Sequence, residues 1–192
     1  MERTILEVHG SLHVAIPKEI ARARGWKAGD RVSFREADGS LVLRVVTPFE
    51  GKCAFTIGYQ GRSPDGFVDA LKHHHICKVI DVRERPLSRR RGFSKVALSA
   101  NLQRAGIEYF PFPELGSPTA IRQVYREAGD FATFEKGYRE HLETRARELR
   151  QLRALVAEEP SAILCYEQDW TECHRSILSD YLEKEGFTVV HL

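Results

Sequence analysis

The sequence lacks any apolar run near the roughly 20 residues that a membrane-spanning helix needs. The first residues, Met1–Thr4, also lack the basic and then apolar pattern of a secretory signal peptide. These absences predict a cytoplasmic protein with no membrane partner. Cysteine is scarce too, and the four cysteines are Cys53, Cys77, Cys165 and Cys173. Without an export signal we expect them to be reduced thiols rather than disulfides.

Several familiar motifs are missing as well. Structural zinc sites are usually marked by two pairs of closely spaced ligands, whereas here only Cys173 and His174 are adjacent and Cys165 lies eight positions earlier. No glycine-rich phosphate loop or dinucleotide fingerprint is present, and the deaminase pairing of His-x-Glu with Cys-x-x-Cys is absent. The sequence therefore predicts no metal and no cofactor.

The sequence has no large excess of charge of either sign, because it contains 29 basic and 27 acidic residues and its net charge is +2. Any affinity for nucleic acid must therefore come from local clusters of basic residues rather than from the field of the whole molecule. The 42% of hydrophobic residues is ordinary for a globular protein, which argues against disorder.

Residues 1–47 show short apolar runs with β character around one short helix. Expected strands are Ile5–Val8, Leu12–Ile16, Val32–Phe34 and Leu41–Val46, with turns at Gly10-Ser11 and Asp38-Gly39. Pro17 suits the start of a helix over Lys18–Arg24, and Gly25 suits its C-terminal cap. So small a unit buries too little surface to be stable alone. A core shared with a second copy would solve this.

This segment resembles the AbrB/SpoVT-like swapped-hairpin family. The resemblance is carried by Ile16-Pro17-Lys18-Glu19-Ile20, Gly25-Trp26, Gly29-Asp30-Arg31-Val32 and Leu41-Val42-Leu43. It implies an obligate homodimer through residues 1–47 that usually binds DNA. Two positions depart from the family, since His13 and Ala21 stand where basic residues are common. The candidate DNA-binding residues are Lys18, Arg22 and Arg24, and a module that only dimerises is the alternative.

Residues 48–52 read as a linker, and residues 53–192 alternate between strand and helix patterns. Expected strands are Ala54–Ile57, Lys78–Val82, Tyr109–Phe112, Ala162–Cys165 and Thr188–Leu192. One expected helix begins at Ser63-Pro64 and runs towards His73. Three more are expected over Lys95–Arg104, Phe131–Val156 and His174–Glu185. This alternation predicts an α/β fold with a mainly parallel, Rossmann-like sheet covered by helices on both faces.

Polar residues follow four of these strands. They are Gly58-Tyr59-Gln60, Asp81-Val82-Arg83, Glu114-Leu115-Gly116 and Cys165-Tyr166-Glu167. Because ligands of parallel sheets bind at the carboxyl ends of the strands, we expect these loops to converge on one site. The second loop holds five arginines within residues 83–91, a pattern that suits phosphate binding; a solvated surface loop is the alternative.

Cysteine chemistry is the other candidate activity of this site. A helix starting near Cys173 would direct its positive dipole end to this edge and favour a thiolate. The candidate catalytic residues are Cys165, Cys173, His174 and Glu167. The candidate residues for a phosphate ligand are Tyr59, Asp81, Arg83, Ser88, Arg89 and Arg175. Buried structural roles for the cysteines remain open.

The second segment resembles the conserved-domain family of unknown function numbered 488, over nearly all of residues 53–192. The strings that carry the resemblance are Asp-Val-Arg-x-x-Pro-x-Ser-Arg, from Asp81, and Cys-x-Glu with Cys-His-Arg, from Cys165 and Cys173. It implies one α/β domain whose polar strings share a pocket, and Tyr166 stands where smaller residues are common. No settled reaction comes with it.

Three hypotheses follow. The first is a nucleic-acid-associated homodimer whose α/β domain binds a phosphate-bearing ligand or a nucleic-acid segment, with Tyr59 stacking on a base. The second is a cysteine-dependent hydrolase or sulfur transferase that uses Cys165 or Cys173. The third is a dimeric structural adaptor.

Overall fold

The computed structural model describes residues 5–8, 11–26, 31–37, 40–46 and 52–192. The chain forms two compact units, Met1–Pro48 and Phe49–Leu192. In the described part of the chain, no helix has the length and apolarity to cross a membrane. The predicted turns at Gly10-Ser11 and Asp38-Gly39 and the predicted linker fall wholly or partly outside the described residues.

The first unit contains two antiparallel hairpins and one short helix. Strands β1 (Ile5–Val8) and β2 (Ser11–Val14) form one two-stranded sheet, and β3 (Arg31–Ala37) and β4 (Ser40–Val46) form another. Helix α1 (Lys18–Ala23) lies between the hairpins in the sequence. Gly25 has a φ of 68°, the left-handed conformation expected of the residue that ends this helix.

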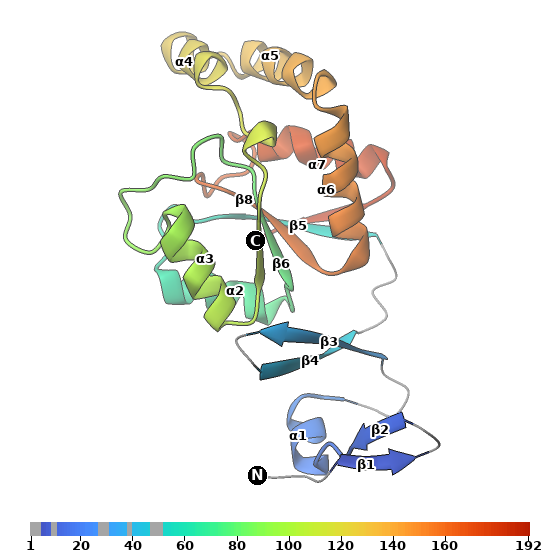
Figure 1. Ribbon diagram of the computed structural model, residues 1–192. Coiled ribbons are helices and arrows are strands. Elements are labelled where there is room, and N and C mark those ends of the chain that lie inside the picture. Colours follow the sequence, from blue (N-terminus) through green and yellow to red (C-terminus); the bar gives the residue numbers. More distant parts are fainter. Residues whose placement is uncertain (1–4, 9–10, 27–30, 38–39, 47–51) are drawn as a thin grey trace. The chain divides into compact units, whose positions relative to one another are not determined.

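The second unit is built on a five-stranded parallel sheet (Figure 1). Its strands are β5 (Cys53–Gly58), β6 (Lys78–Asp81), β7 (Glu108–Pro111), β8 (Ser161–Cys165) and β9 (Thr188–His191). They lie in the order β7-β6-β8-β5-β9, and every pairing is parallel. The central strand β8 is buried along its whole length, as expected for a parallel sheet covered on both faces.

Helices cover both faces of this sheet. Helices α2 (Pro64–His73) and α3 (Lys95–Arg104) pack one hydrophobic cluster against Val79, Ala162 and Leu164. Helices α5 (Phe131–Glu143), α6 (Ala146–Glu158) and α7 (Arg175–Lys184) pack a second cluster that contains Ile80 and Ile163. Successive strand residues point to opposite faces, which explains why Val79 and Ile80 fall in different clusters. The predicted α/β class with a parallel, doubly covered sheet is confirmed.

Two helical predictions need correction. The single helix expected over Phe131–Val156 is two helices, because Arg145 leaves the helical conformation with φ −116° and ψ 31°. The apolar residues Leu142 and Leu149 keep helical spacing across the break, so their pattern does not mark it. Helix α4 (Thr119–Ala128) and the short 3₁₀ helix η1 (Pro113–Leu115) were not predicted from the sequence.

Candidate functional site

Four chemically reactive side chains meet at the carboxyl end of the central strand. Cys165 is the last residue of β8, and Glu167 follows two residues later. Cys173 and His174 come directly before α7, and His174 is its N-cap residue. Cys165, Cys173 and His174 are buried, with 5%, 2% and 5% of their surfaces exposed. We call these four residues the thiol cluster.

The members of the thiol cluster contact one another closely. The thiols of Cys165 and Cys173 lie 2.9 and 3.1 Å from Glu167 Oε2, at which both are placed to donate. Each sulfur also lies 3.6 Å from His174 Nδ1. One carboxylate oxygen and one ring nitrogen therefore both contact the two sulfurs. The four residues predicted to be catalytic therefore lie together, and their catalytic roles stay a prediction.

The imidazole of His174 is held in one orientation. Its Nε2 lies 3.1 Å from the carbonyl oxygen of Val82, so Nε2 carries a proton and donates it there. In the neutral ring, Nδ1 is then the acceptor and faces the sulfurs. The ring of Tyr138 packs edge-on against the imidazole, with centroids 5.3 Å apart. The Tyr138 hydroxyl donates to the Leu115 carbonyl, which ties a third loop to the cluster.

Burial and mutual charge perturb the acidities of the thiol cluster. Burial raises the pKa of Cys165 well above its ordinary value, and the hydrogen bond with Cys173 adds to this. Burial alone would also raise the pKa of Cys173, but the hydrogen bond from Cys165 and the charge of His174 hold it well below normal. Burial and the nearby Cys173 charge raise the pKa of Glu167. Of the two thiols, Cys173 therefore loses its proton more readily than Cys165.

Arg175 holds the loop between Cys165 and Cys173. It is 1% exposed, and its guanidinium donates to the backbone carbonyl oxygens of Glu167 and Gln168 and to Thr56 Oγ1. Arg175 was predicted from the sequence to bind phosphate. The geometry instead gives its donors to the protein's own backbone, so the phosphate assignment stays a prediction that these contacts do not favour.

Arg83, a second predicted phosphate ligand, is also engaged by the protein. It forms a bidentate ion pair with Asp81, at 2.8 and 2.6 Å, and both side chains are at most 5% exposed. Its remaining nitrogen donates to Tyr59 Oη at 3.1 Å and to the Phe93 carbonyl at 2.8 Å. Tyr109 donates to the same carboxylate at 2.6 Å. Arg83 thereby joins the first and last parts of the 83–93 loop.

The rest of that loop is different, because its basic side chains face solvent. Arg85, Arg89, Arg90, Arg91 and Lys95 are exposed. Ser88, predicted as a ligand residue, accepts a hydrogen bond from the backbone N–H of Arg90 at 3.1 Å and so stabilises the local turn. We call the exposed segment 85–91 the arginine loop.

Tyr59 is 3% exposed and stacks on Phe93 with ring centroids 4.5 Å apart. The Arg83 guanidinium lies over the Tyr59 ring, 5.1 Å from its centroid. Stacking on a base, as predicted for Tyr59, would need this ring to be uncovered. Its observed neighbours explain why the tyrosine follows β5: it packs the base of the arginine loop onto the sheet.

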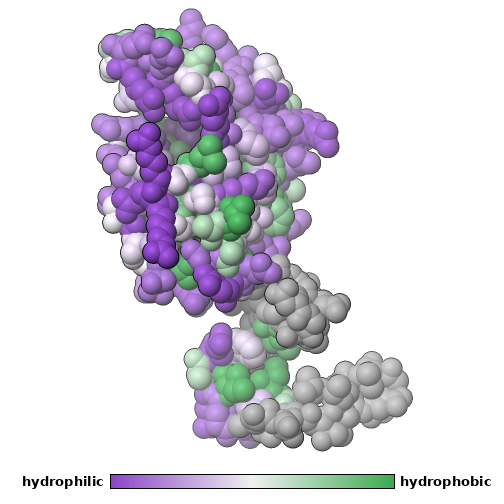
Figure 2. Space-filling view, turned by 60° about the vertical axis from the view of Figure 1, so that its left-hand side comes forward, coloured by the Kyte–Doolittle hydropathy of each residue, from purple (hydrophilic) through white to green (hydrophobic). Residues whose placement is uncertain are grey.

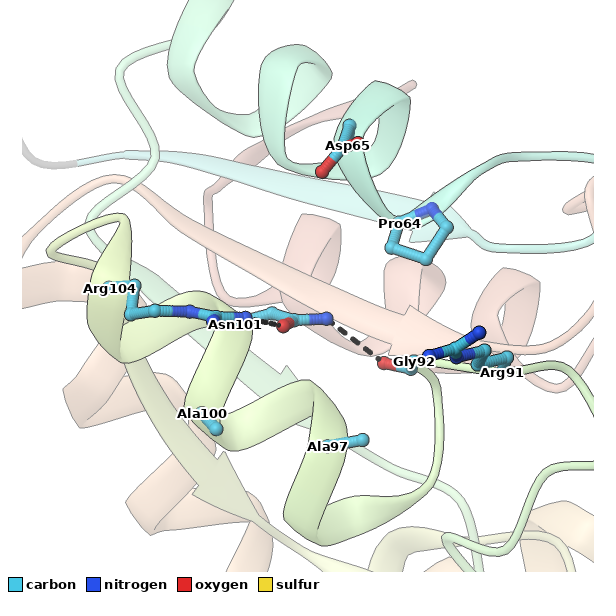
Figure 3. Close-up of a pocket in the computed structure, with 8 residues that line it drawn as sticks. All are labelled: Pro64, Asp65, Arg91, Gly92, Ala97, Ala100, Asn101 and Arg104. Atoms are coloured by element: carbon cyan, nitrogen blue, oxygen red, sulfur yellow. Dashed lines mark hydrogen bonds between the residues drawn. The ribbon is translucent and has the colours of Figure 1, made fainter.

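A hollow of about 560 Å³ lies between helices α2 and α3 (Figure 3). In the close-up, Pro64 lies over Gly92, and the Asn101 amide points to the Gly92 carbonyl, which it contacts at 3.5 Å. Arg91 and Arg104 flank the hollow at its edges. The residues that line this hollow include no member of the thiol cluster.

The space-filling view shows a mostly hydrophilic face with small, separated hydrophobic patches (Figure 2).

The predicted DNA-binding residues of the first unit are exposed. Lys18 and Arg22 lie in α1, Arg24 follows its last turn, and all three side chains face solvent. Among residues 15–26, none is buried, and Ile16 and Ile20 are 39% and 43% exposed. Within the described part of one chain, these two apolar side chains are therefore only partly covered.

Comparisons with known proteins match a different family in each of the two compact units. Residues 5–50 match the family described as antidote-toxin recognition MazE, bacterial antitoxin, which is AbrB/SpoVT-like. Residues 63–182 match the family described as domain of unknown function DUF488. Searches of curated proteins and of solved structures found no match. Both predicted resemblances are confirmed, in the predicted order. Because the second match covers more than half of the chain, the protein belongs to the DUF488 family and carries a MazE-like domain at its N-terminal end.

Proposed function

We propose that this protein is a DNA-associated homodimer in which the MazE-like unit binds DNA and the arginine loop of the α/β unit adds a second phosphate-binding surface. The observation that carries the proposal is the match of residues 5–50 to an AbrB-like antitoxin family together with solvent-exposed basic residues on both units. Basic side chains that face solvent are free to neutralise phosphates.

Dimerisation is supported by what the first unit leaves unburied. A two-stranded hairpin is at best marginally stable alone, and the described strands of this unit form two such hairpins. The exposed Ile16 and Ile20 flank the start of α1. A second copy of the same unit would cover these apolar groups and complete the hairpin sheets.

Phosphate binding by the α/β unit is supported by the different positions of its arginines, one buried in an ion pair and the others exposed. The ion pair with Asp81 anchors Arg83 and closes the base of the loop, while Arg85, Arg89 and Arg91 remain exposed above it. An anchored loop presents its guanidinium groups with a smaller loss of conformational entropy on binding.

The test compares three variants of the full chain, each with three basic residues replaced by glutamine. One carries Lys18, Arg22 and Arg24 changes; one carries Arg85, Arg89 and Arg91 changes; the control carries changes at the exposed Arg126, Arg147 and Arg150. Fluorescence anisotropy of labelled duplex DNA is measured over a range of salt. Each lost phosphate contact should reduce the slope of log K against log salt by about 0.9, so each test variant should lose up to about 2.7.

At near-physiological salt the first two variants should bind on the order of 100-fold more weakly, and the control should bind as wild type does. Sedimentation of the same samples should show two copies per particle. Equal loss in all three variants would mean that only net charge matters, and the proposal would fail. If the arginine-loop variant alone keeps wild-type affinity, DNA contact belongs to the first unit only.

A second candidate function is thiol chemistry, favoured by the contact of the Cys173 sulfur with both His174 Nδ1 and Glu167. In that case the sulfur would attack an electrophilic substrate while His174 carries the proton. Metal-free protein should then contain one thiol that iodoacetamide alkylates at least about tenfold faster than free cysteine, and peptide mapping should locate it at Cys173. Four slow thiols in the native protein would rule this function out.

A further inference from the structure

We propose that the thiol cluster is a closed binding site for a thiophilic divalent cation such as Zn²⁺, with Cys165, Cys173, His174 and Glu167 as its four ligands. This inference is independent of DNA binding. Two thiolates, one imidazole and one carboxylate are ligand types that Zn²⁺ takes in proteins. In the described residues, the donor atoms of Cys165, Cys173 and His174 all lie within 4.8 Å of one another.

The sulfur-to-nitrogen distances fit tetrahedral coordination. Zinc–sulfur bonds near 2.3 Å and zinc–nitrogen bonds near 2.05 Å, at tetrahedral angles, place sulfur and nitrogen about 3.6 Å apart. Both sulfurs lie 3.6 Å from His174 Nδ1. Glu167 Oε2 lies closer to the sulfurs, at 2.9 and 3.1 Å. Among the described residues, the group of donor atoms that all lie within 4.8 Å of one another does not include Glu167. The Glu167 side chain would therefore rotate on metal binding to bring its carboxylate to the fourth position.

The imidazole is already prepared for this role. A metal-binding histidine usually donates its other ring N–H to a carbonyl or carboxylate, which fixes the tautomer and aims the free nitrogen at the metal. His174 does so through Nε2, which contacts the Val82 carbonyl on the neighbouring strand end. Edge-on packing of Tyr138 fixes the plane of the ring. The lone pair of Nδ1 therefore points to the sulfurs.

Charge balance also favours a cation at this position. With both thiols deprotonated, the thiol cluster holds three negative charges in a buried place, which is costly without compensation. A divalent cation and the adjacent Arg175 guanidinium, bonded to the Glu167 carbonyl, supply three positive charges. Binding replaces two S–H bonds by metal–sulfur bonds and releases two protons to solvent.

Four protein ligands and burial make this a structural site. A catalytic zinc site keeps one position open for water or substrate, whereas here the three residues Cys165, Cys173 and His174 are at most 5% exposed. The cation would join the end of β8 to the start of α7 across the intervening loop. The metal would then stabilise that loop in its folded arrangement.

The experiment uses the full chain, reduced and stripped of metal, titrated with Co²⁺ and then Zn²⁺. Wild type should bind one Co²⁺ with thiolate-to-cobalt charge-transfer absorption and strong visible bands of tetrahedral cobalt, and Zn²⁺ should displace it. Cys165→Ser and Cys173→Ser, which each keep one thiolate, should each weaken the charge-transfer band and weaken zinc binding by more than about 100-fold. Cys53→Ser, a half-buried cysteine in β5, is the matched control and should bind as wild type does.

Circular dichroism of each variant shows whether it is folded, and the wild-type cobalt spectrum tests the site without any variant. Three results would overturn the proposal. Reduced wild type could bind no Co²⁺ or Zn²⁺; its bound Co²⁺ could show no thiolate band; or Cys165→Ser and Cys173→Ser could retain zinc as tightly as the Cys53→Ser control.

Discussion

Asp81→Asn is expected to lower the free energy of unfolding by about 3–5 kcal/mol, because it leaves a buried guanidinium without its counter-ion. Asp81 is 1% exposed and accepts from three donors: the Arg83 side chain, the Arg83 backbone N–H at 3.1 Å, and the Tyr109 hydroxyl. An asparagine presents one oxygen and one NH₂ group, so its NH₂ would face donors. The neutral side chain also no longer balances the Arg83 charge.

Denaturant unfolding of the full chain, followed by far-ultraviolet circular dichroism, measures this change. The matched control is Glu135→Gln, which breaks the pair with Arg139 at the surface. Both partners there are more than a third exposed, and such pairs contribute at most about 1 kcal/mol. If the two variants lose similar stability, the buried pair does not hold the 83–93 loop in place.

The different roles of the arginines in residues 83–91 could not be read from the sequence. Five arginines in one loop after a strand predict an anion site, and the pattern treats them alike. Arg83 differs from the others because its side chain pairs with Asp81, the last residue of β6. It also donates to the Phe93 carbonyl at 2.8 Å. That carbonyl is ten residues away in the chain, and its approach depends on the folded loop. The pattern thus located the basic loop, but it did not show that Arg83 is buried and holds the loop in place.

The α/β class was predictable because strands and helices alternate with strong local signals. Ser63 accepts from the Gly66 N–H at 3.1 Å, as its place before Pro64 suggested. The strand order was not predictable, since it places β8 between β5 and β6 through contacts far apart in the chain. This order pairs Asp81 with Leu164, so that the ends of β6 and β8 lie side by side. The predicted loops that follow these two strands are thereby neighbours.

The composition of the thiol cluster was partly predictable. All four of its residues were singled out as candidate catalytic groups because they follow a strand or precede a helix. The sequence predicted no metal at these residues, because Cys-x-Glu followed by Cys-His does not have the two short-spaced ligand pairs typical of zinc sites. The carboxylate between the two sulfurs is visible only in three dimensions, at 2.9 and 3.1 Å from them.

Gly58→Ala is expected to lower the free energy of unfolding by at least about 3 kcal/mol and to open the thiol cluster to solvent. A Cβ at this position, the end of β5, would lie 1.8 Å from the backbone oxygen of Glu167 and 2.9 Å from the Cα of Gln168. Backbone atoms cannot rotate away as a flexible side chain can. The loop that carries Glu167 must therefore move, and the Arg175 bonds to its carbonyl oxygens must break or lengthen.

The matched control is Gly137→Ala in helix α5, where the atoms nearest to the added Cβ belong to the Ile121 side chain, at 3.4 Å or more. An alanine in place of a helical glycine should stabilise the protein by about 0.5–1 kcal/mol. The same one-methyl change thus has opposite expected signs at the two sites. A thiol reagent with peptide mapping gives the second measurement: Cys165 and Cys173 should react faster in Gly58→Ala and at the wild-type rate in Gly137→Ala. If Gly58→Ala is as stable as wild type and its buried thiols stay protected, the approach of β5 to the Glu167 loop is not what closes the cluster.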